Sequence, residues 1–598
     1  MSMSKNIARL AVTAGLTAAL SFGGVMAPVT MAFADGTPTV AQSGNVTIED
    51  SIYTDTTFKG IQIFKATVTQ DKKNNAWNGD KTLSDINWAS PEVMNAVTSA
   101  FAGVEGTPAA DAGAQAWAKY INDNAGAKVG QTAKVDAGST LDKIAAALEG
   151  STLTWTNPSD SSKGAFKALD TGYWLFVTAS VGSTMSSDLA NGNTDAYTSP
   201  IFAVVGGEDV NVDSKKDVPN VTKAVKDDKN GSFVDSSKVV PEGSSRDVFT
   251  APNRVADSAS DQLIEYQLAG TVASNINTYK EYSYTFTDVL PSTMLPELNG
   301  SDPVVEVKIG DQVVHPSSYN KSYVDGKLKV SFSNLKNAHV KKQDGTEGEA
   351  INVDGSSKVY VNYKAKLDPT QVKADMLGKG QKNTVTLTYS NNPHSIDTGT
   401  PDTGTTVVHP AYDYTYGIDV TKVGSDDEGK WLAGVEFTLQ EQGDDGSYIK
   451  ADGTKAKDSE QAKLTTDANG KINVVGLDEG AYVLTEVKPA PGYNNSHSAG
   501  ITFTITRGTL PADDTTVVNP GCTLATGTDG NLVKVAQTNT EAADGKVHFT
   551  VTDQKGSGLP LTGLNGVTFT WIAGGAVLCI GVAHLIRSRK QAEESEQE

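Results

Sequence analysis

Residues 417–440 read GIDVTKVGSDDEGKWLAGVEFTLQ, and two later stretches complete the pattern, AYVLTEVKPAPGY at 481–493 and HFTVTDQKGSG at 548–558. Apolar and polar residues alternate in all three, which is typical of half-buried β-strands. In each strand the apolar stripe continues onto an ionisable residue of the same face. An unpaired buried charge is costly, so we expect these three groups to meet in the core. They are Lys422, Glu486 and Asp553.

A meeting of these three groups permits a covalent bond. Desolvation lowers the pKa of an amine and raises that of a carboxyl group. A neutral Lys422 amine can then attack the carboxyl carbon of Asp553, while a protonated Glu486 hydrogen-bonds the carbonyl and shuttles protons. Water leaves and an amide remains, with the folded core supplying the proximity that the reaction needs.

The three stretches resemble the CnaB-type domain of Gram-positive surface proteins, which forms a Lys–Asn or Lys–Asp isopeptide bond. YVLTEVKPAPGY matches the E-box of that family, and the match implies that Glu486 is the catalytic acid. Pilins of the family usually carry Asn on the last strand, where this chain has Asp553. The resemblance therefore implies loss of water rather than ammonia.

A second region has the same organisation. It opens with VPNVTKAVKDD, in which Lys223 shares a face with its apolar neighbours, and it closes with NTVTLTYSNNP. Strand parity favours Asn391 as the partner of Lys223, and Asn392 and Asn383 remain possible. The region resembles the CnaA-type middle domain of backbone pilins.

That resemblance implies a catalytic aspartate just before a strand of the middle domain. The segment SDQLIEYQL offers Asp261, one residue out of register, which a β-bulge would correct. Asp288 in YTFTDVL is the alternative.

The linker VNVDSKKDVPN, residues 210–220, lies where a pilin carries its acceptor lysine. It resembles the family pattern V-Y-P-K-N without the Tyr and Pro. Lys215 aligns with the motif lysine, and its neighbour Lys216 is the alternative.

The N-terminus has the pattern of a secretory signal peptide. Lys5 and Arg9 precede an apolar run, and Ala32-Phe33-Ala34 fits the small-x-small cleavage pattern. We expect cleavage between Ala34 and Asp35.

The C-terminus resembles a sortase sorting signal in three parts: a pentapeptide, an apolar span at about 567–586, and a basic tail. The resemblance implies that a sortase cysteine thiolate attacks the Thr562 carbonyl, that Gly563 leaves, and that an amine resolves the thioester. That amine would be Lys215 of another subunit or a cell-wall peptide amine. The pentapeptide is Leu559, Pro560, Leu561, Thr562 and Gly563.

Short alternating runs bounded by turn residues recur along the whole chain, and they predict a mainly β protein of tandem immunoglobulin-like (Cna-type) sandwiches. Helical spacing occurs only in the first third, at 91–103, 111–123 and 140–150. We predict five segments: a signal peptide (1–34), an N-terminal pilin domain (35–216), a CnaA-like middle domain (217–410), a CnaB-like domain (411–556) and a sorting signal with a transmembrane helix (557–598).

Composition excludes several other functions. A formal net charge of −21 argues against nucleic acid as a partner. The two cysteines, Cys522 and Cys579, offer no disulfide within the exterior, because Cys579 lies in the expected membrane segment. There is no HExxH, CxxC, Walker A or GxSxG pattern, so we expect neither an enzyme nor a bound metal or cofactor.

Together these features predict a backbone subunit of a sortase-assembled pilus, exported, transiently membrane-tethered and then anchored to the cell wall. Its expected partners are pilus-specific and housekeeping sortases, other copies of itself, peptidoglycan, and a host or matrix ligand for adhesion. The alternative is a non-polymerising LPXTG wall-anchored adhesin.

Overall fold

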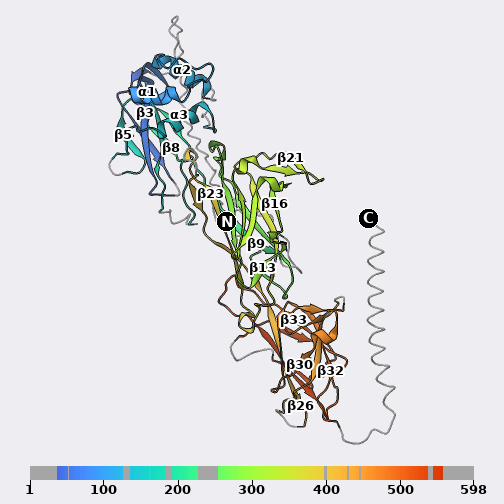
Figure 1. The fold of residues 1–598 in the computed structure, drawn as a ribbon. Coiled ribbons are helices and arrows are strands. Elements are labelled where there is room, and N and C mark those ends of the chain that lie inside the picture. The colour runs from blue at the N-terminus through green and yellow to red at the C-terminus, as the bar shows by residue number, and fades with distance from the viewer. Residues whose placement is uncertain are drawn as a thin grey trace, which may run out of the picture.

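The computed structural model describes residues 37–50, 53–125, 135–159, 162–183, 192–226, 233, 253–395, 401–426, 430–443, 446–536 and 543–556. Three β-rich domains lie end to end (Figure 1). No helix within these ranges is both long and apolar enough to span a bilayer. The expected signal peptide with its Ala34–Asp35 cleavage point, the pentapeptide Leu559–Gly563 and the expected transmembrane segment lie outside the described residues.

The first domain combines two sheets with three helices. The larger sheet has the order β1-β3-β6-β7, with β4 also paired to β3, and the smaller has the order β5-β2-β8. One apolar core lies between the sheets and a second lies under the helices. The strands are β1 (Thr37–Val40), β2 (Gly44–Glu49), β3 (Thr57–Lys73), β4 (Ala76–Trp88), β5 (Ala165–Leu169), β6 (Gly172–Ser180), β7 (Ile201–Val205) and β8 (Val210–Asp213).

The three helices confirm the helical spacing of the sequence. They are α1 (Pro91–Ser99), α2 (Ala114–Asn124) and α3 (Thr140–Glu149). Ser90 and Ser139 cap α1 and α3 by accepting hydrogen bonds from backbone N–H groups of the first turn. Each helix buries one apolar stripe, represented by Val97, Trp117 and Ile144.

The middle domain is a sandwich of two large sheets. One has the order β10-β25-β23-β12-β19-β18, with β24 added to β23, and the other has the order β17-β16-β22-β11-β9, with β13 added to β22. The main strands are β9 (Val221–Lys226), β10 (Val255–Asp257), β11 (Ile264–Thr271), β12 (Tyr284–Val289), β13 (Met294–Pro296), β16 (Val305–Ile309), β17 (Gln312–Val313), β18 (Asn320–Val324), β19 (Lys327–Phe332), β22 (Lys358–Leu367), β23 (Gln381–Ser390), β24 (Thr403–Thr405) and β25 (His409–Tyr414).

Smaller elements decorate this sandwich. Two short hairpins are formed by β14 (Leu298–Asn299) with β15 (Asp302–Pro303), and by β20 (His339–Lys341) with β21 (Glu347–Ala350). Single 3₁₀ turns occupy Ile276–Thr278, Pro316–Ser318, Leu335–Asn337 and Ala374–Met376.

The third domain is a smaller sandwich whose first and last strands are parallel neighbours. A four-stranded sheet, β31-β26-β36-β35, faces a sheet of order β29-β28-β27-β32-β33-β34, with β30 added to β27. A 3₁₀ turn spans Ser459–Ala462. The strands are β26 (Tyr416–Gly424), β27 (Glu436–Glu441), β28 (Tyr448–Ile449), β29 (Lys455–Ala456), β30 (Leu464–Thr465), β31 (Lys471–Leu477), β32 (Gly480–Lys488), β33 (Ile501–Thr506), β34 (Gly521–Leu524), β35 (Val533–Ala536) and β36 (Lys546–Asp553).

Both domain junctions are held by specific contacts. At the first, Thr194 and Tyr197 donate backbone hydrogen bonds to the carbonyls of Thr405 and Asn391 in the middle domain. At the second, the Arg507 guanidinium of the third domain lies 2.7 Å from a buried carboxylate oxygen of Asp257. Strand β25 pairs with β23 and β10, so the middle domain continues to Tyr414, a few residues past the expected end at 410.

Candidate functional site

In the third domain the structure brings Lys422, Glu486 and Asp553 together. The Lys422 amine lies 2.8 Å from Glu486 Oε2 and also contacts Asp553 Oδ1, and all three side chains are fully buried. The register of β26 and β36 causes this meeting, because it sets Gly424 opposite Asp553 at the shared end of two parallel strands. Glu486 arrives from β32 in the facing sheet.

The electrostatics of this cluster favour proton transfer. Burial raises the pKa of Glu486 to about 7, against the opposing effect of the Lys422 charge. The Phe437 ring lies 5.5 Å from the Lys422 amine and helps to keep water away. A carboxyl group that is half protonated near neutral pH can donate a proton to one oxygen and later accept one from nitrogen.

His497 also approaches this cluster, and the sequence reasoning missed it. Its Nε2 lies 3.9 Å from Asp553 Oδ1 and 3.0 Å from the carbonyl oxygen of Thr552. Burial lowers the pKa of His497, which favours the neutral ring. One ligand atom each from Glu486, His497 and Asp553 lies within 4.8 Å of the others, a spacing suited to a metal ion. The Lys422 amine already pairs with both carboxylates, so a cation there would have to displace it.

In the middle domain Lys223 meets partners other than the two favoured by sequence. Its amine contacts the buried carboxylate of Asp288 and donates a hydrogen bond to the Tyr363 hydroxyl at 2.9 Å. The Asn383 Nδ2 donates to the same hydroxyl, also at 2.9 Å. The Tyr363 hydroxyl in turn donates a hydrogen bond to Asp288 Oδ1 at 3.2 Å. The sequence did not single out this tyrosine, because an aromatic residue on the core-facing side of a strand usually serves only to fill the core.

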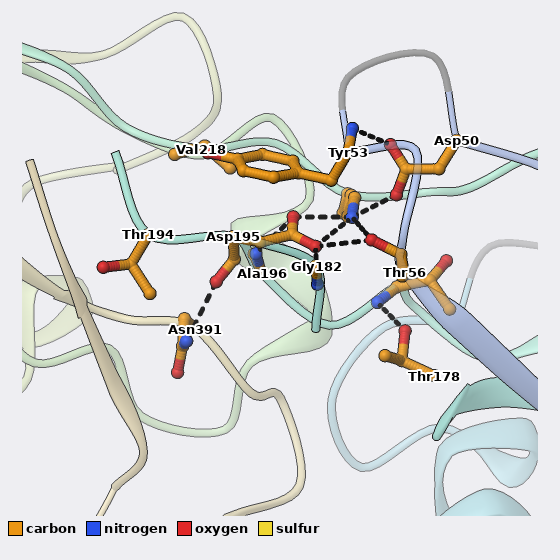
Figure 2. Close-up of polar contacts among 12 residues, drawn as sticks. Asp50, Tyr53, Thr56, Thr178, Gly182, Thr194, Asp195, Ala196, Val218 and Asn391 are labelled. Carbon is orange, nitrogen blue, oxygen red and sulfur yellow. Dashed lines mark hydrogen bonds and ion pairs between the residues drawn. The ribbon is translucent and has the colours of Figure 1, made fainter. Parts of the chain in front are cut away.

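Asn391, the partner that parity favours, lies away from Lys223. Its Nδ2 donates to the Asp195 carbonyl of the first domain at 3.0 Å (Figure 2). Asn383 lies in β23 and Asn391 follows directly after that strand, so eight residues of extended chain place them roughly 26 Å apart. Asp288 pairs with Val385 in the adjacent strand, so the register places this acid near the Asn383 end of β23. Asn392 hydrogen-bonds Asp402 at the surface.

Asp261, the favoured acid of the middle domain, is also placed elsewhere. It lies in a turn before β11 with a φ of 67°, and its half-exposed side chain pairs with Lys366. Asp288, the alternative, is fully buried, and burial raises its pKa. Burial likewise lowers the pKa of Lys223 to about 8. Both shifts favour a neutral amine beside a protonated carboxyl group.

The two adjacent linker lysines differ sharply in their surroundings. Lys215 projects an exposed side chain, while its backbone N–H donates to Thr198 Oγ1 at 2.7 Å and its carbonyl accepts from Ser199 and Asn275. Neighbouring atoms still desolvate the amine in part, which lowers the pKa of Lys215. Lys216 points inward, and only 1% of its side chain is exposed.

Comparison with known proteins places the third domain in a described fold. Residues 417–520 match the model of the SpaA domain, a prealbumin-like fold. A search of curated protein sequences found no match to this chain.

Several solved pilin structures are similar to the chain at low identity. The full-length major pilin SpaD from Corynebacterium diphtheriae is 15% identical, with 86% of this chain and 98% of that chain covered and a TM-score of 0.41. The T6 backbone pilin of serotype M6 Streptococcus pyogenes is 14% identical, with 88% and 100% covered and a TM-score of 0.43. The major pilin BcpA of Bacillus cereus is 14% identical, with 67% and 92% covered and a TM-score of 0.35.

Proposed function

We propose that this chain is the structural backbone subunit of a covalently polymerised cell-surface pilus. The observation that carries the proposal is the buried cluster of Lys422, Glu486 and Asp553, which joins the first and last strands of the third domain. An isolated buried ion triad adds little stability to a fold. An amide between the same strands would let tension pass directly from one strand to the other.

Two internal amides follow from the side chains that meet. In the third domain the Lys422 amine attacks Asp553, Glu486 relays the protons, and one water leaves. In the middle domain the Lys223 amine attacks the side-chain amide of Asn383, Asp288 relays the protons, and one ammonia leaves. The shared Tyr363 hydroxyl supports this pairing, because it holds the two reacting groups within one hydrogen bond of a common atom.

Polymerisation requires an amine that a sortase can reach. A sortase would cleave between Thr562 and Gly563, and Lys215 of the next subunit would accept Thr562. The exposed side chain of Lys215, its fixed backbone and its lowered pKa support this role. The burial of Lys216 argues against the alternative acceptor.

The proposal implies a specific set of partners and a location. Pilus-specific and housekeeping sortases would act on the sorting signal, other copies of the chain would extend the polymer, and peptidoglycan would receive its base. The precursor would be tethered in the membrane and the product anchored to the wall, with adhesion as the pilus's role. The chain would catalyse only its own internal amides, one turnover each, and would not be an enzyme.

The test is the formation of polymers in a host that supplies the cognate sortase. Wall extracts should contain an SDS-resistant ladder of high-mass species, and Lys215→Arg should abolish it because a guanidinium is a poor nucleophile at neutral pH. Lys65→Arg, at another exposed lysine of the first domain, is the matched control and should keep the ladder.

The competing adhesin function predicts a different result. A wall-anchored protein that does not polymerise would give one monomeric band in all three strains. A ladder that persists in Lys215→Arg would instead exclude Lys215 as the acceptor. Peptide mass spectrometry of wall-released material should identify the Thr562–Lys215 linkage directly.

A further inference from the structure

The outer face of one middle-domain sheet carries a pocket of about 470 Å³ that the proposed function does not use. Residues of three neighbouring strands, β11, β22 and β16, line it, in the sheet that also contains β9 (Figure 1). Side chains of these strands alternate between the core and the outside, so every second residue faces outward. The volume lies within the range of roughly 300–1,000 Å³ that small-molecule sites occupy. The outward-facing side chains of the lining include Glu265, Gln267, Glu306, Lys308, Asn362 and Lys364.

Polar side chains form a row across the three strands. The register places Asn362 of β22 between Glu306 of β16 and Gln267 of β11. Neighbouring strands lie about 4.8 Å apart, so the row extends over roughly 10 Å. Gln267 Nε2 donates a hydrogen bond to Asn362 Oδ1 at 3.0 Å, which orders both amides. Asn362 Nδ2 and Gln267 Oε1 have no partner among the described residues, so this pair of amides keeps a donor and an acceptor for a ligand.

The charges around this row are largely balanced within the sheet. The Lys308 amine lies 3.0 Å from a carboxylate oxygen of Glu306, and the Lys364 amine lies 3.9 Å from one of Glu265. Glu297 adds a third carboxylate to the lining. Three acidic and two basic residues leave a slight negative balance, which disfavours an anionic ligand. The pocket therefore suits an uncharged polar ligand.

Apolar groups complete the lining of the pocket. Phe233 contributes an aromatic ring, and Val304, which is 40% exposed, contributes a branched aliphatic side chain. The negative face of an aromatic ring attracts C–H groups. A sugar ring presents C–H groups on its faces and hydroxyls around its edge, each of them both a donor and an acceptor. Amides, carboxylates and an aromatic ring in one pocket therefore match a carbohydrate.

We propose that this pocket binds a neutral glycan, with Asn362 and Gln267 holding sugar hydroxyls and Phe233 contacting a sugar face. A peptide that docks as an added strand is a poorer match, because it needs a sheet edge with free backbone groups. All three strands of the pocket lie inside the sheet and have a paired neighbour on each side.

A glycan pocket gives adhesion a class of ligand, and this step rests on the proposed function. Every subunit of the polymer would carry one pocket, and a site that is weak in one subunit gains avidity when many copies are linked. Glycan binding by a single subunit does not require polymerisation, so the two proposals can fail separately.

Array binding by the monomeric exported chain, produced in a host without the sortase, tests the pocket. The probes are neutral oligosaccharides of hexoses and N-acetylhexosamines, printed beside their sialylated and sulfated forms. At least one neutral oligosaccharide should bind. Its acidic forms should bind more weakly, because the carboxylates of the lining repel them.

Variants of the pocket locate the binding. Asn362→Ala and Gln267→Ala should each weaken binding about tenfold, which corresponds to the loss of one hydrogen bond. Phe233→Ala should weaken it as well, because the contact to the sugar face is lost. Lys358→Ala, on the same face of β22 but outside the pocket, is the matched control and should bind like the unaltered chain. All four side chains are half-buried, and an unchanged melting temperature should show that each variant folds.

Three results would overturn the glycan proposal: no neutral oligosaccharide bound, binding that persists in both amide variants, or binding restricted to acidic glycans. A peptide ligand whose binding is lost in Asn362→Ala while no glycan binds would also overturn it, and would assign the pocket to a protein partner. None of these results depends on the SDS-resistant ladder, and a missing ladder would contradict only polymerisation.

Discussion

Lys223 and Asn383 donate hydrogen bonds to one oxygen, the hydroxyl of Tyr363, each at 2.9 Å. They come from β9 and β23, strands of the two opposite sheets of the middle domain. Asp288, which contacts the same amine and the same hydroxyl, completes a site with a nucleophile, an acceptor and an acid. The proposed cross-link of the middle domain rests on this arrangement.

Asn383→Ala should abolish the proposed middle-domain amide, because Asn383 is the asparagine that shares the Tyr363 hydroxyl with Lys223. The unaltered chain should be lighter by one ammonia, about 17 Da, from this domain, and the variant should not. Asn391→Ala should keep the bond, since Asn391 contacts the first domain. Intact mass and peptide mapping distinguish the two, and a bond retained in Asn383→Ala would refute the assignment.

Asp288→Asn should also prevent the middle-domain amide, because the proton relay would be lost while the shape of the side chain is kept. The matched control is Asp261→Asn, which alters the exposed ion pair with Lys366 and should leave the bond intact. Mass spectrometry after purification measures both. The opposite pattern, with Asp261→Asn unreacted, would restore the sequence-based choice of acid.

Glu486→Gln should leave the third domain without its amide and less resistant to heat. The bond would close a loop between residues 131 positions apart, worth roughly 4–5 kcal/mol in the chain-entropy model. Scanning calorimetry should show a lower melting temperature for the third domain, and intact mass should show that the water is retained. A variant with a normal cross-link would remove Glu486 from the mechanism.

Formation of the third-domain amide should depend on pH in a defined direction. Burial raises the pKa of Glu486 from 4.5 to about 7, so the protonated, proton-donating form prevails below pH 7. Above pH 7 the protonated fraction falls about tenfold for each pH unit. Because this pKa is higher in the folded than in the unfolded chain, protonated Glu486 stabilises the unreacted fold. The stabilisation is complete below pH 4.5 and is lost as the pH rises through 7. Refolding denatured, unreacted chain at pH 6 and pH 9 and following the loss of water by mass should show faster reaction at pH 6.

The junction of the first two domains should loosen at high pH. His394 lies 3.2 Å from Asp142 and also contacts Glu149, both on α3. Burial lowers its pKa, but the hydrogen bonds to the two carboxylates outweigh this and raise it to about 9. The contact between His394 and the two carboxylates therefore stabilises the junction fully below pH 6.5, and this stabilisation is lost as the pH rises through 9. Small-angle scattering should show larger maximum dimensions at pH 10, and His394→Gln should show them already at pH 7.

Much of the third-domain site could be predicted from local pattern, and only part of the middle-domain site. Lys422, Glu486 and Asp553 each end an apolar stripe, so alternation alone assigned them to the core. In the middle domain, strand parity favoured Asn391 and left Asn383 and Asn392 as possibilities. The choice depends on which end of β23 lies beside Asp288, a relationship between strands far apart in the sequence.

By itself, the sequence determined the mainly β architecture, the three helices of the first domain and the core-facing lysine of each later domain. These features follow from local alternation, helical spacing and capping residues. Only the tertiary structure decided that Lys223 contacts Asp288 and shares the Tyr363 hydroxyl with Asn383. It also decided that Lys215 is exposed while Lys216 is buried between two aspartates. The physical reason is register. Pairing between distant strands fixes which residues stand opposite one another, and a local pattern specifies only the face on which each one lies.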